Sequence, residues 1–180
     1  MQINEALRDL FSESAKPLVL AIDGPAGSGK STLAGEIARA FAGTYDIEVI
    51  HLDELYNGWD DALSEELFLR IAQLIAAQQA GKATDLAIYD WSAAAFSGSR
   101  EVKAVQLLII EGVGSSNHLL HANLTTSIWL DIDQSIGLAR VLERDGDEIH
   151  DEMVKWQKME SEYFARDLTR ERADFILSTQ

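Results

Sequence analysis

The chain contains no cysteine, only two prolines, and few basic residues: 15 Lys and Arg stand against 30 Asp and Glu in 180 residues. Without cysteine, disulfides and thiolate metal sites are excluded. The formal net charge of −15 repels nucleic acid and anionic membranes, so we expect neither as a partner. A small-molecule partner is compatible with this charge if basic side chains gather locally.

Long apolar runs are missing as well. No stretch of the sequence approaches the ~18 apolar residues that span a bilayer. The N-terminal residues MQINEALRDLFSESAK lack the basic and apolar regions of a signal peptide, and their apolar spacing predicts an amphipathic helix over about residues 2–14. We expect a cytoplasmic protein that forms one domain over residues 1–180. The oligomeric state stays open.

Strand-like and helical segments alternate along the chain. Apolar runs predict strands at residues 17–22, 47–52, 105–112, 126–132 and 173–177. Helical spacing predicts helices at residues 30–42, 63–80, 134–144 and about 150–169. Residues 86–91 are too short and ambiguous to assign. This alternation predicts an α/β fold of three layers, with a mostly parallel five-stranded sheet and helices on both faces.

The stretch DGPAGSGKST, residues 23–32, lies between the first predicted strand and the helix that follows it, and it matches G-x-x-x-x-G-K-[ST]. In this motif, backbone N–H groups surround phosphates and the helix directs its positive end at them. A glycine turn that merely starts a helix is the alternative, but the strand–loop–helix context favours a P-loop NTPase fold that binds ATP and Mg²⁺. The predicted nucleotide-binding residues are Gly24, Ala26, Gly27, Ser28, Gly29, Lys30, Ser31 and Thr32. Lys30 would reach the β- and γ-phosphates, and the Ser31 hydroxyl would ligate Mg²⁺.

Two carboxylates are expected beside this loop, at the carboxyl edge of the sheet where α/β proteins bind ligands. Asp53 follows the second predicted strand, and Glu111 ends the strand at 105–112. Asp53 could accept the proton of an acceptor hydroxyl and help to hold Mg²⁺, and Glu111 could hold Mg²⁺, as such carboxylates usually do, through water. Capping of a turn or helix is the alternative for both side chains.

Aromatic residues follow Asp53 in the same loop. Tyr56 and Trp59 could wall an acceptor pocket, or they could pack the loop onto the domain. Both readings stay open.

Arginines gather in the last third of the chain. Arg140 and Arg144 lie four residues apart on one helical face, and phosphoryl transfer spreads negative charge that arginine can neutralise. We predict that both are catalytic, like Lys30 and Asp53, within a helical lid over about residues 140–170. For the later arginines a solvated charged face is favoured; these are Arg166, Arg170 and Arg172.

The kind of P-loop protein is narrowed by motifs that the sequence lacks. There is no N-K-x-D guanine motif and no LSGGQ-like stretch. A small-molecule kinase or a small ATP-dependent regulator remains.

Several segments together resemble the uridine kinase-like branch of P-loop kinases, and especially its small actinobacterial-type members. They are DGPAGSGKST, LDELY (52–56), YDW (89–91), IIEG (109–112), ARVLERD (139–145) and RADFIL (172–177). The resemblance implies an ATP- and Mg²⁺-dependent kinase with a nucleoside acceptor, Asp53 as the catalytic base, and Tyr89 and Arg100 as substrate contacts. Pyrimidine-specific members of that family carry a histidine shortly after this YDW segment. The corresponding stretch of this chain, YDWSAAAFSGSR (89–100), contains no histidine. A kinase for a non-nucleoside metabolite and an ATP-binding regulator therefore stay open, as does the choice between ATP and GTP.

Overall fold

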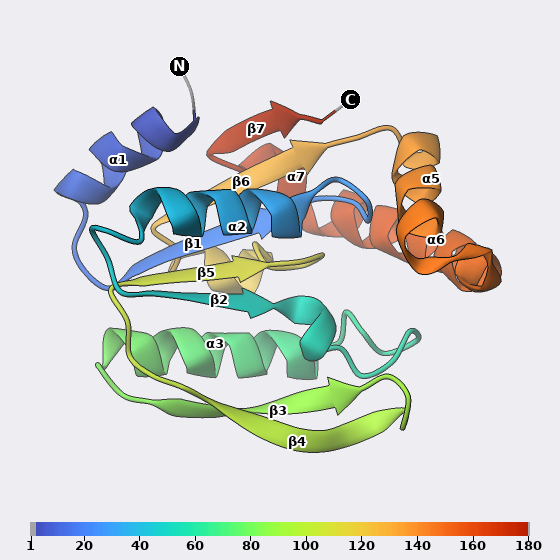
Figure 1. The fold of residues 1–180 in the computed structure, drawn as a ribbon, viewed down its shortest axis with the longest axis horizontal. Coiled ribbons are helices and arrows are strands. Elements are labelled where there is room, and N and C mark those ends of the chain that lie inside the picture. The colour runs from blue at the N-terminus through green and yellow to red at the C-terminus, as the bar shows by residue number, and fades with distance from the viewer. Residues whose placement is uncertain (1–2, 180) are drawn as a thin grey trace.

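A central parallel sheet organises the computed structural model, which describes residues 3–179. All neighbouring strands of this sheet pair in parallel, so their carboxyl ends share one edge, on the right of Figure 1. In spatial order the five strands are β2 (Ile47–His51), β5 (Leu107–Glu111), β1 (Leu18–Asp23), β6 (Thr126–Asp131) and β7 (Phe175–Ser178).

Helices surround this sheet. The longer ones are α1 (Ile3–Glu13), α2 (Lys30–Phe41), α3 (Glu65–Gln79), α5 (Gln134–Asp145) and α6 (His150–Asp167). The shorter ones are η1 (Leu52–Glu54), α4 (His118–His121), η2 (Asp147–Ile149) and α7 (Thr169–Arg172). Among residues 3–179, no helix has the length and apolar composition needed to cross a membrane.

The sheet is covered on both faces, which explains why β1 and β5 are apolar and buried along their whole length. One apolar cluster joins α1 and α2 to the face that carries Leu20 and Ile109. A second cluster joins α3 and α6 to the face that carries Val19 and Ile110. The predicted fold class, a mostly parallel five-stranded sheet between helices, is confirmed.

The sequence analysis did not predict the short helices, nor a separate antiparallel hairpin of β3 (Thr84–Asp90) and β4 (Ala95–Val102). This hairpin lies beside α3, below the main sheet in Figure 1. The sequence AFSGSREV of β4 is almost wholly exposed and carries no alternating apolar pattern, so periodicity could not reveal it. The hairpin places Trp91, the residue after β3, next to the loop that follows β2.

Substitutions in α3 test which face of this helix supports the fold. Ile71 is 0% exposed, whereas Leu69 on the same helix is 54% exposed. We expect Ile71→Ala to lower the free energy of unfolding by about 2–5 kcal/mol, because it leaves a cavity in the core. Leu69→Ala should change it by less than about 0.5 kcal/mol. Chemical denaturation of both variants measures the difference, and equal losses would contradict the packing described.

Candidate active site

Three neighbouring strands deliver the phosphate loop, Asp53 and Glu111 to one edge of the sheet. β5 lies between β2 and β1, so Glu111 at its end faces both neighbours. Asp53 lies on η1, immediately after β2, and the phosphate loop follows β1. Residues 80 positions apart in the chain are thereby brought together: the Ser31 hydroxyl donates a hydrogen bond of 2.9 Å to Glu111 Oε1.

The glycines of the phosphate loop serve two different purposes. A Cβ atom on Gly24 would lie 2.5 Å from the backbone oxygen of Leu130, and one on Gly27 would lie 2.2 Å from that of Gly137. These two glycines therefore let the loop pack against β6 and α5. Gly29 has φ +91° and nothing within 4 Å of its Cβ position, so this side of the loop is open to a ligand.

Polar groups of the loop are poised for an anion. Gly29 caps α2 without any side-chain hydrogen bond, so the first N–H groups of this helix point outward. The buried Ser28 hydroxyl has no hydrogen-bond partner among the described residues. Lys30 Nζ donates to the backbone oxygens of Gly24 and Pro25, at 2.9 and 2.8 Å. These groups fit the phosphates of a nucleotide.

The residues expected to hold Mg²⁺ supply hard oxygen atoms, as that ion requires. Glu111 Oε1 accepts from Ser31 and also contacts His51 Nδ1 at 2.5 Å. Within residues 3–179 no group of three His, Asp or Glu side chains forms a ready-made metal cluster. Mg²⁺ in nucleotide sites is usually held by one or two protein oxygens together with phosphates and water. Ser31, Asp53 and Glu111 thus fit the ion chemically.

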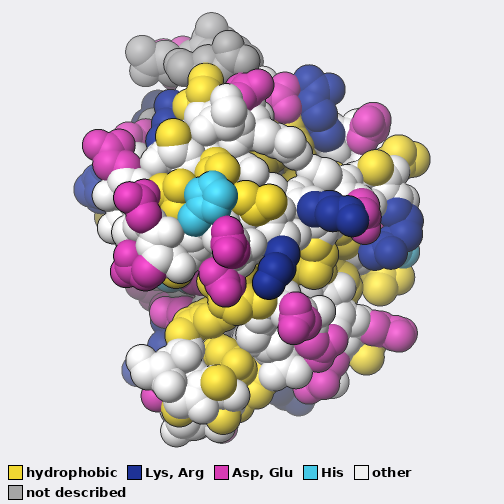
Figure 2. All heavy atoms as spheres, turned by 90° about the vertical axis from the view of Figure 1, so that its right-hand side faces the viewer, with side chains coloured by type: hydrophobic (Ala, Val, Ile, Leu, Met, Phe, Trp, Pro, Cys, Tyr) yellow, Lys and Arg dark blue, Asp and Glu magenta, His cyan; other side chains and the backbone are white. Residues whose placement is uncertain are grey.

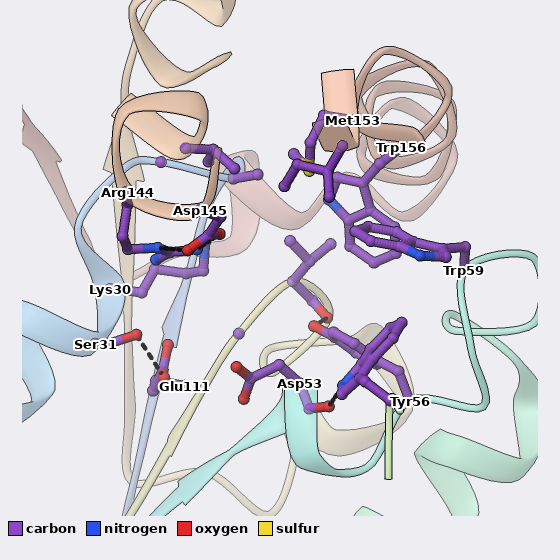
Figure 3. A pocket seen from close by; sticks show the side chains of 17 residues that line it. Lys30, Ser31, Asp53, Tyr56, Trp59, Glu111, Arg144, Asp145, Met153 and Trp156 are labelled. Carbon is purple, nitrogen blue, oxygen red and sulfur yellow. Dashed lines mark hydrogen bonds and ion pairs between the residues drawn. The ribbon is translucent and has the colours of Figure 1, made fainter. Parts of the chain in front are cut away.

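Two cavities meet at the phosphate loop. The first, which we call the aromatic cavity, measures about 520 Å³ (Figure 3). It is lined by Ala26, Gly27, Lys30, Ser31, Asp53, Tyr56, Trp59, Trp91, Glu111, Gly112, Val113, Val141, Arg144, Asp145, Ile149, Met153 and Trp156. The second, which we call the loop cavity, measures about 700 Å³ and extends along residues 27–33 to Arg140 and the end of β7. Lys30, Ser31 and Arg144 line both cavities.

The two helix arginines reach these cavities in different ways. Arg140 lines the loop cavity, where its guanidinium donates to the backbone oxygens of Thr179, at 2.7 Å, and Gly27, at 3.4 Å. Arg144 faces both cavities but is held in a two-pronged pair with Asp145, at 2.7 and 2.6 Å. Its charge is therefore partly neutralised in this structure.

Two of the later arginines are engaged away from both cavities. Arg170 pairs with Asp131 at 2.7 Å, and Arg172 pairs with Asp167. Arg166 lines neither cavity. These three arginines therefore lie where charged side chains stabilise the fold or face solvent.

A carboxylate that the sequence did not single out lies under the phosphate loop. Glu160, on α6, is 1% exposed and accepts a hydrogen bond of 3.0 Å from the backbone N–H of Ala26. Burial raises the pKa of Glu160 to about 7, against the opposing effects of Lys30, the Ala26 N–H group and Trp156. Glu160 therefore joins α6 to the loop. Its position depends on packing between distant segments, so no local sequence signal identified it.

Of the four aromatic and basic residues that the sequence suggested as substrate contacts, the structure places two in the aromatic cavity and two outside both cavities. Tyr56 and Trp59 line the aromatic cavity. Tyr89 and Arg100 line neither cavity: Tyr89 packs behind Trp91 with ring centroids 5.2 Å apart, and Arg100 pairs with Glu48 at 2.6 Å. The sequence analysis missed Trp91, whose only signal was its place in the YDW segment, and Trp156, which α6 brings from far along the chain.

Fold and site together place a phosphate loop at the carboxyl edge of a five-stranded parallel sheet. No protein-family model matches the sequence. The chain is 24% identical, over 150 residues, to proteins named uridine kinase from two strains of Limosilactobacillus reuteri, covering 75% of this chain and 68% of each relative.

Solved structures share the fold. A protein described as a possible uridine kinase from Bacillus stearothermophilus aligns with a TM-score of 0.68 and 22% identity, over 96% of this chain and 99% of that one. A candidate fructose transport system kinase from Silicibacter sp. TM1040 aligns with a TM-score of 0.74 and 21% identity, over 97% of both chains. D-glycerate 3-kinase from Cryptococcus neoformans aligns with a TM-score of 0.57 and 13% identity, over 82% of this chain and 78% of that one. The expected resemblance to uridine kinase-like P-loop kinases is confirmed.

Gly27 packs against α5 whereas Gly29 faces open space, so we expect alanine at these two positions to lower the free energy of unfolding by different amounts. Both Gly27 and Gly29 have positive φ, which costs a substituted residue about 1 kcal/mol. Gly27→Ala must also displace the Gly137 backbone, so we expect a further loss of about 1–3 kcal/mol in the free energy of unfolding. Denaturant titration of the two variants, without nucleotide, gives this comparison. Equal losses would show that the loop does not pack as described.

The pH dependence of stability tests the environment of Glu160. Its pKa rises from 4.5 to about 7 on folding, so the folded state binds a proton that the unfolded state has released between these values. The stability that this group contributes is complete below about pH 4.5 and is lost as the pH rises through about 7. Because glutamine cannot ionise, we expect the free energy of unfolding of Glu160→Gln, relative to the parent, to rise by about 2–4 kcal/mol between pH 5 and pH 8.

Glu162→Gln, which changes an exposed carboxylate of the same helix, serves as the control and should show no such trend. Urea unfolding at several pH values provides the measurement. A flat difference for Glu160→Gln would place its pKa in the ordinary range.

Proposed function

We propose that the chain is an ATP- and Mg²⁺-dependent kinase that transfers the γ-phosphoryl group to a hydroxyl of a small molecule. The observation that carries this proposal is the meeting of two cavities at Lys30 and Ser31. A phosphoryl transfer enzyme must hold donor and acceptor on opposite sides of the moving group. The loop cavity suits the nucleotide, and the aromatic cavity suits the acceptor.

Each side chain has a defined task in this reaction. The N–H groups at the start of α2 and Lys30 bind the phosphates, and Asp53 accepts the proton of the acceptor hydroxyl. Ser31 and Glu111 would hold Mg²⁺, which neutralises phosphate charge when bound. Arg140 and Arg144 lie beside the phosphate loop. In this proposal Arg144 leaves its partner Asp145 and binds phosphate oxygens instead. In this proposal α5, η2 and α6 act as the lid, because residues 141–156 form one wall of the aromatic cavity.

Uridine is the first acceptor to test, because the relatives matched in sequence are named uridine kinases. The alternative is an ATP-binding regulator, which would bind nucleotide in the same loop without acceptor-stimulated turnover. Both functions require Lys30, but only the kinase requires Asp53. This difference makes the two functions experimentally separable.

Asp53→Asn should lower acceptor-dependent ADP production by about 10²–10⁴-fold, because the amide cannot take the hydroxyl proton. Binding of Mg·ATP, measured by calorimetry, should stay within about threefold of the parent, whereas Lys30→Ala should weaken it strongly. Asp85→Asn, at an exposed position of β3 outside both cavities, is the matched control. Mg·ATP binding without ADP release on any acceptor of a nucleoside, sugar and alcohol panel would favour the regulator.

A further inference from the structure

The aromatic cavity is chemically divided into two ends. Its charged groups gather at the phosphate loop, where they are Lys30, Asp53, Glu111, Arg144 and Asp145. The opposite end consists of aromatic and aliphatic side chains, and Figure 3 shows the rings of Tyr56, Trp59 and Trp156 on the side away from Lys30. An acceptor must therefore place its hydroxyl at the charged end and the remainder of the molecule against the rings.

Four rings form a continuous surface, which we call the aromatic wall: Tyr56, Trp59, Trp91 and Trp156. Consecutive ring centroids are 5.5 Å apart for Tyr56 and Trp156, 5.9 Å for Trp156 and Trp59, and 5.1 Å for Trp59 and Trp91. Trp59 and Trp91 remain 36% and 41% exposed. Large aromatic side chains left exposed together at a cavity mark a binding surface.

The polar atoms of this wall are mostly occupied within the protein. Tyr56 Oη donates to the backbone oxygen of Val113 at 2.9 Å, and Trp91 Nε1 donates to that of Asp53 at 2.9 Å. The Trp156 indole lowers the pKa of the Glu160 carboxyl, against the larger effect of burial. The wall thus offers ring faces and few groups that could read the polar edge of a base or the hydroxyls of a sugar.

The charges at the other end disfavour an anionic acceptor. Arg144 is paired with Asp145, and Lys30 is surrounded by the loop that binds phosphate. Among the described lining residues, no other basic side chain faces this cavity. The face of the molecule at the carboxyl edge of the sheet mixes acidic side chains with basic and hydrophobic ones (Figure 2). Lys155 lies beside Trp59 and Trp156, but it lines a neighbouring pocket that also carries the carboxylates of Asp60 and Glu152. A carboxylate or phosphate on the acceptor would therefore find no free basic partner at the aromatic end of this cavity.

We propose that the acceptor is a small alcohol, neutral or cationic, whose hydroxyl is carried on a short arm of a flat aromatic ring that stacks on Trp59 and Trp91. This inference rests on the proposed kinase function and specifies its acceptor. The acceptor oxygen bonds to the γ-phosphorus and its proton passes to Asp53. The bond between that phosphorus and the β,γ-bridging oxygen breaks, and ADP leaves with the electron pair. The ring stays against the wall throughout.

Matched acceptors test this inference on the unmodified chain with Mg·ATP. The panel contains 3-pyridinemethanol, its N-methylated cation, cyclohexylmethanol, uridine, fructose and D-glycerate, and ADP release is the readout. We expect one of the two aromatic alcohols to exceed the kcat/KM of cyclohexylmethanol by about 2- to 12-fold, the worth of an aromatic pair. Uridine, fructose and D-glycerate should fall below the aromatic alcohols, because each polar group buried without a partner weakens binding about 5- to 150-fold.

Substitution of Trp59 identifies the surface responsible. Trp59→Leu should raise the KM of the preferred aromatic alcohol about 2- to 12-fold, whereas Trp59→Phe, which retains a ring, should restore most of it. The KM of ATP should not change in either variant, because Trp59 does not line the loop cavity.

The outcomes separate the two proposals. Faster turnover of uridine, fructose or D-glycerate would overturn the aromatic acceptor and leave the kinase function standing. The same follows if cyclohexylmethanol equals the aromatic alcohols, or if Trp59→Leu and Trp59→Phe behave alike. Mg·ATP binding without ADP release on any alcohol would overturn both proposals together.

Discussion

A single buried carboxylate holds the site together. Asp23, the last residue of β1, is 0% exposed and accepts hydrogen bonds from the backbone N–H groups of Gly24, Gly114 and Ser116, at 2.8, 3.0 and 2.9 Å. The first of these belongs to the phosphate loop, and the other two belong to the turn after β5. Burial raises the pKa of Asp23, while the three donated hydrogen bonds lower it. The positions of the loop and of Glu111 therefore depend on one another, since both segments are anchored to the same side chain.

The second constraint is the contact between this loop and the helices that follow β6. Glycines at 24 and 27 let the loop pack against β6 and the start of α5, and Glu160 of α6 receives the Ala26 N–H group. The expected lid is thus in direct contact with the phosphate loop in this structure. Movement of α6 would expose Glu160 and remove a hydrogen bond from the loop. The shape of the phosphate loop and the position of α6 are physically linked for this reason.

The proposed acceptor side shows how one fold can present different cavities. Lys30, Ser31 and Glu111 are set by backbone geometry that the fold supplies, and kinases of quite different names share this fold. The far wall of the aromatic cavity instead comes from the loop after β2, the residue after β3, and α6. These segments are joined by side-chain packing alone, so their composition can vary without disturbing the sheet. Here they present indole and phenol rings.

The alternation of apolar runs and helical spacing by itself determined the five strands and the long helices, and the G-x-x-x-x-G-K-[ST] motif determined the phosphate loop. Each of these depends on residues close in the chain. The alternation also placed Asp53 and Glu111 at the sheet edge, since parallel strands must end together. Only the tertiary structure revealed the β3–β4 hairpin and the positions of Trp91, Trp156 and Glu160 at the site. Only the tertiary structure likewise showed that Arg100 pairs with Glu48, away from both cavities. These features arise from contacts between segments far apart in sequence, which have no periodicity to reveal them. The phosphate loop could therefore be predicted from the chain, whereas the aromatic cavity required the folded molecule.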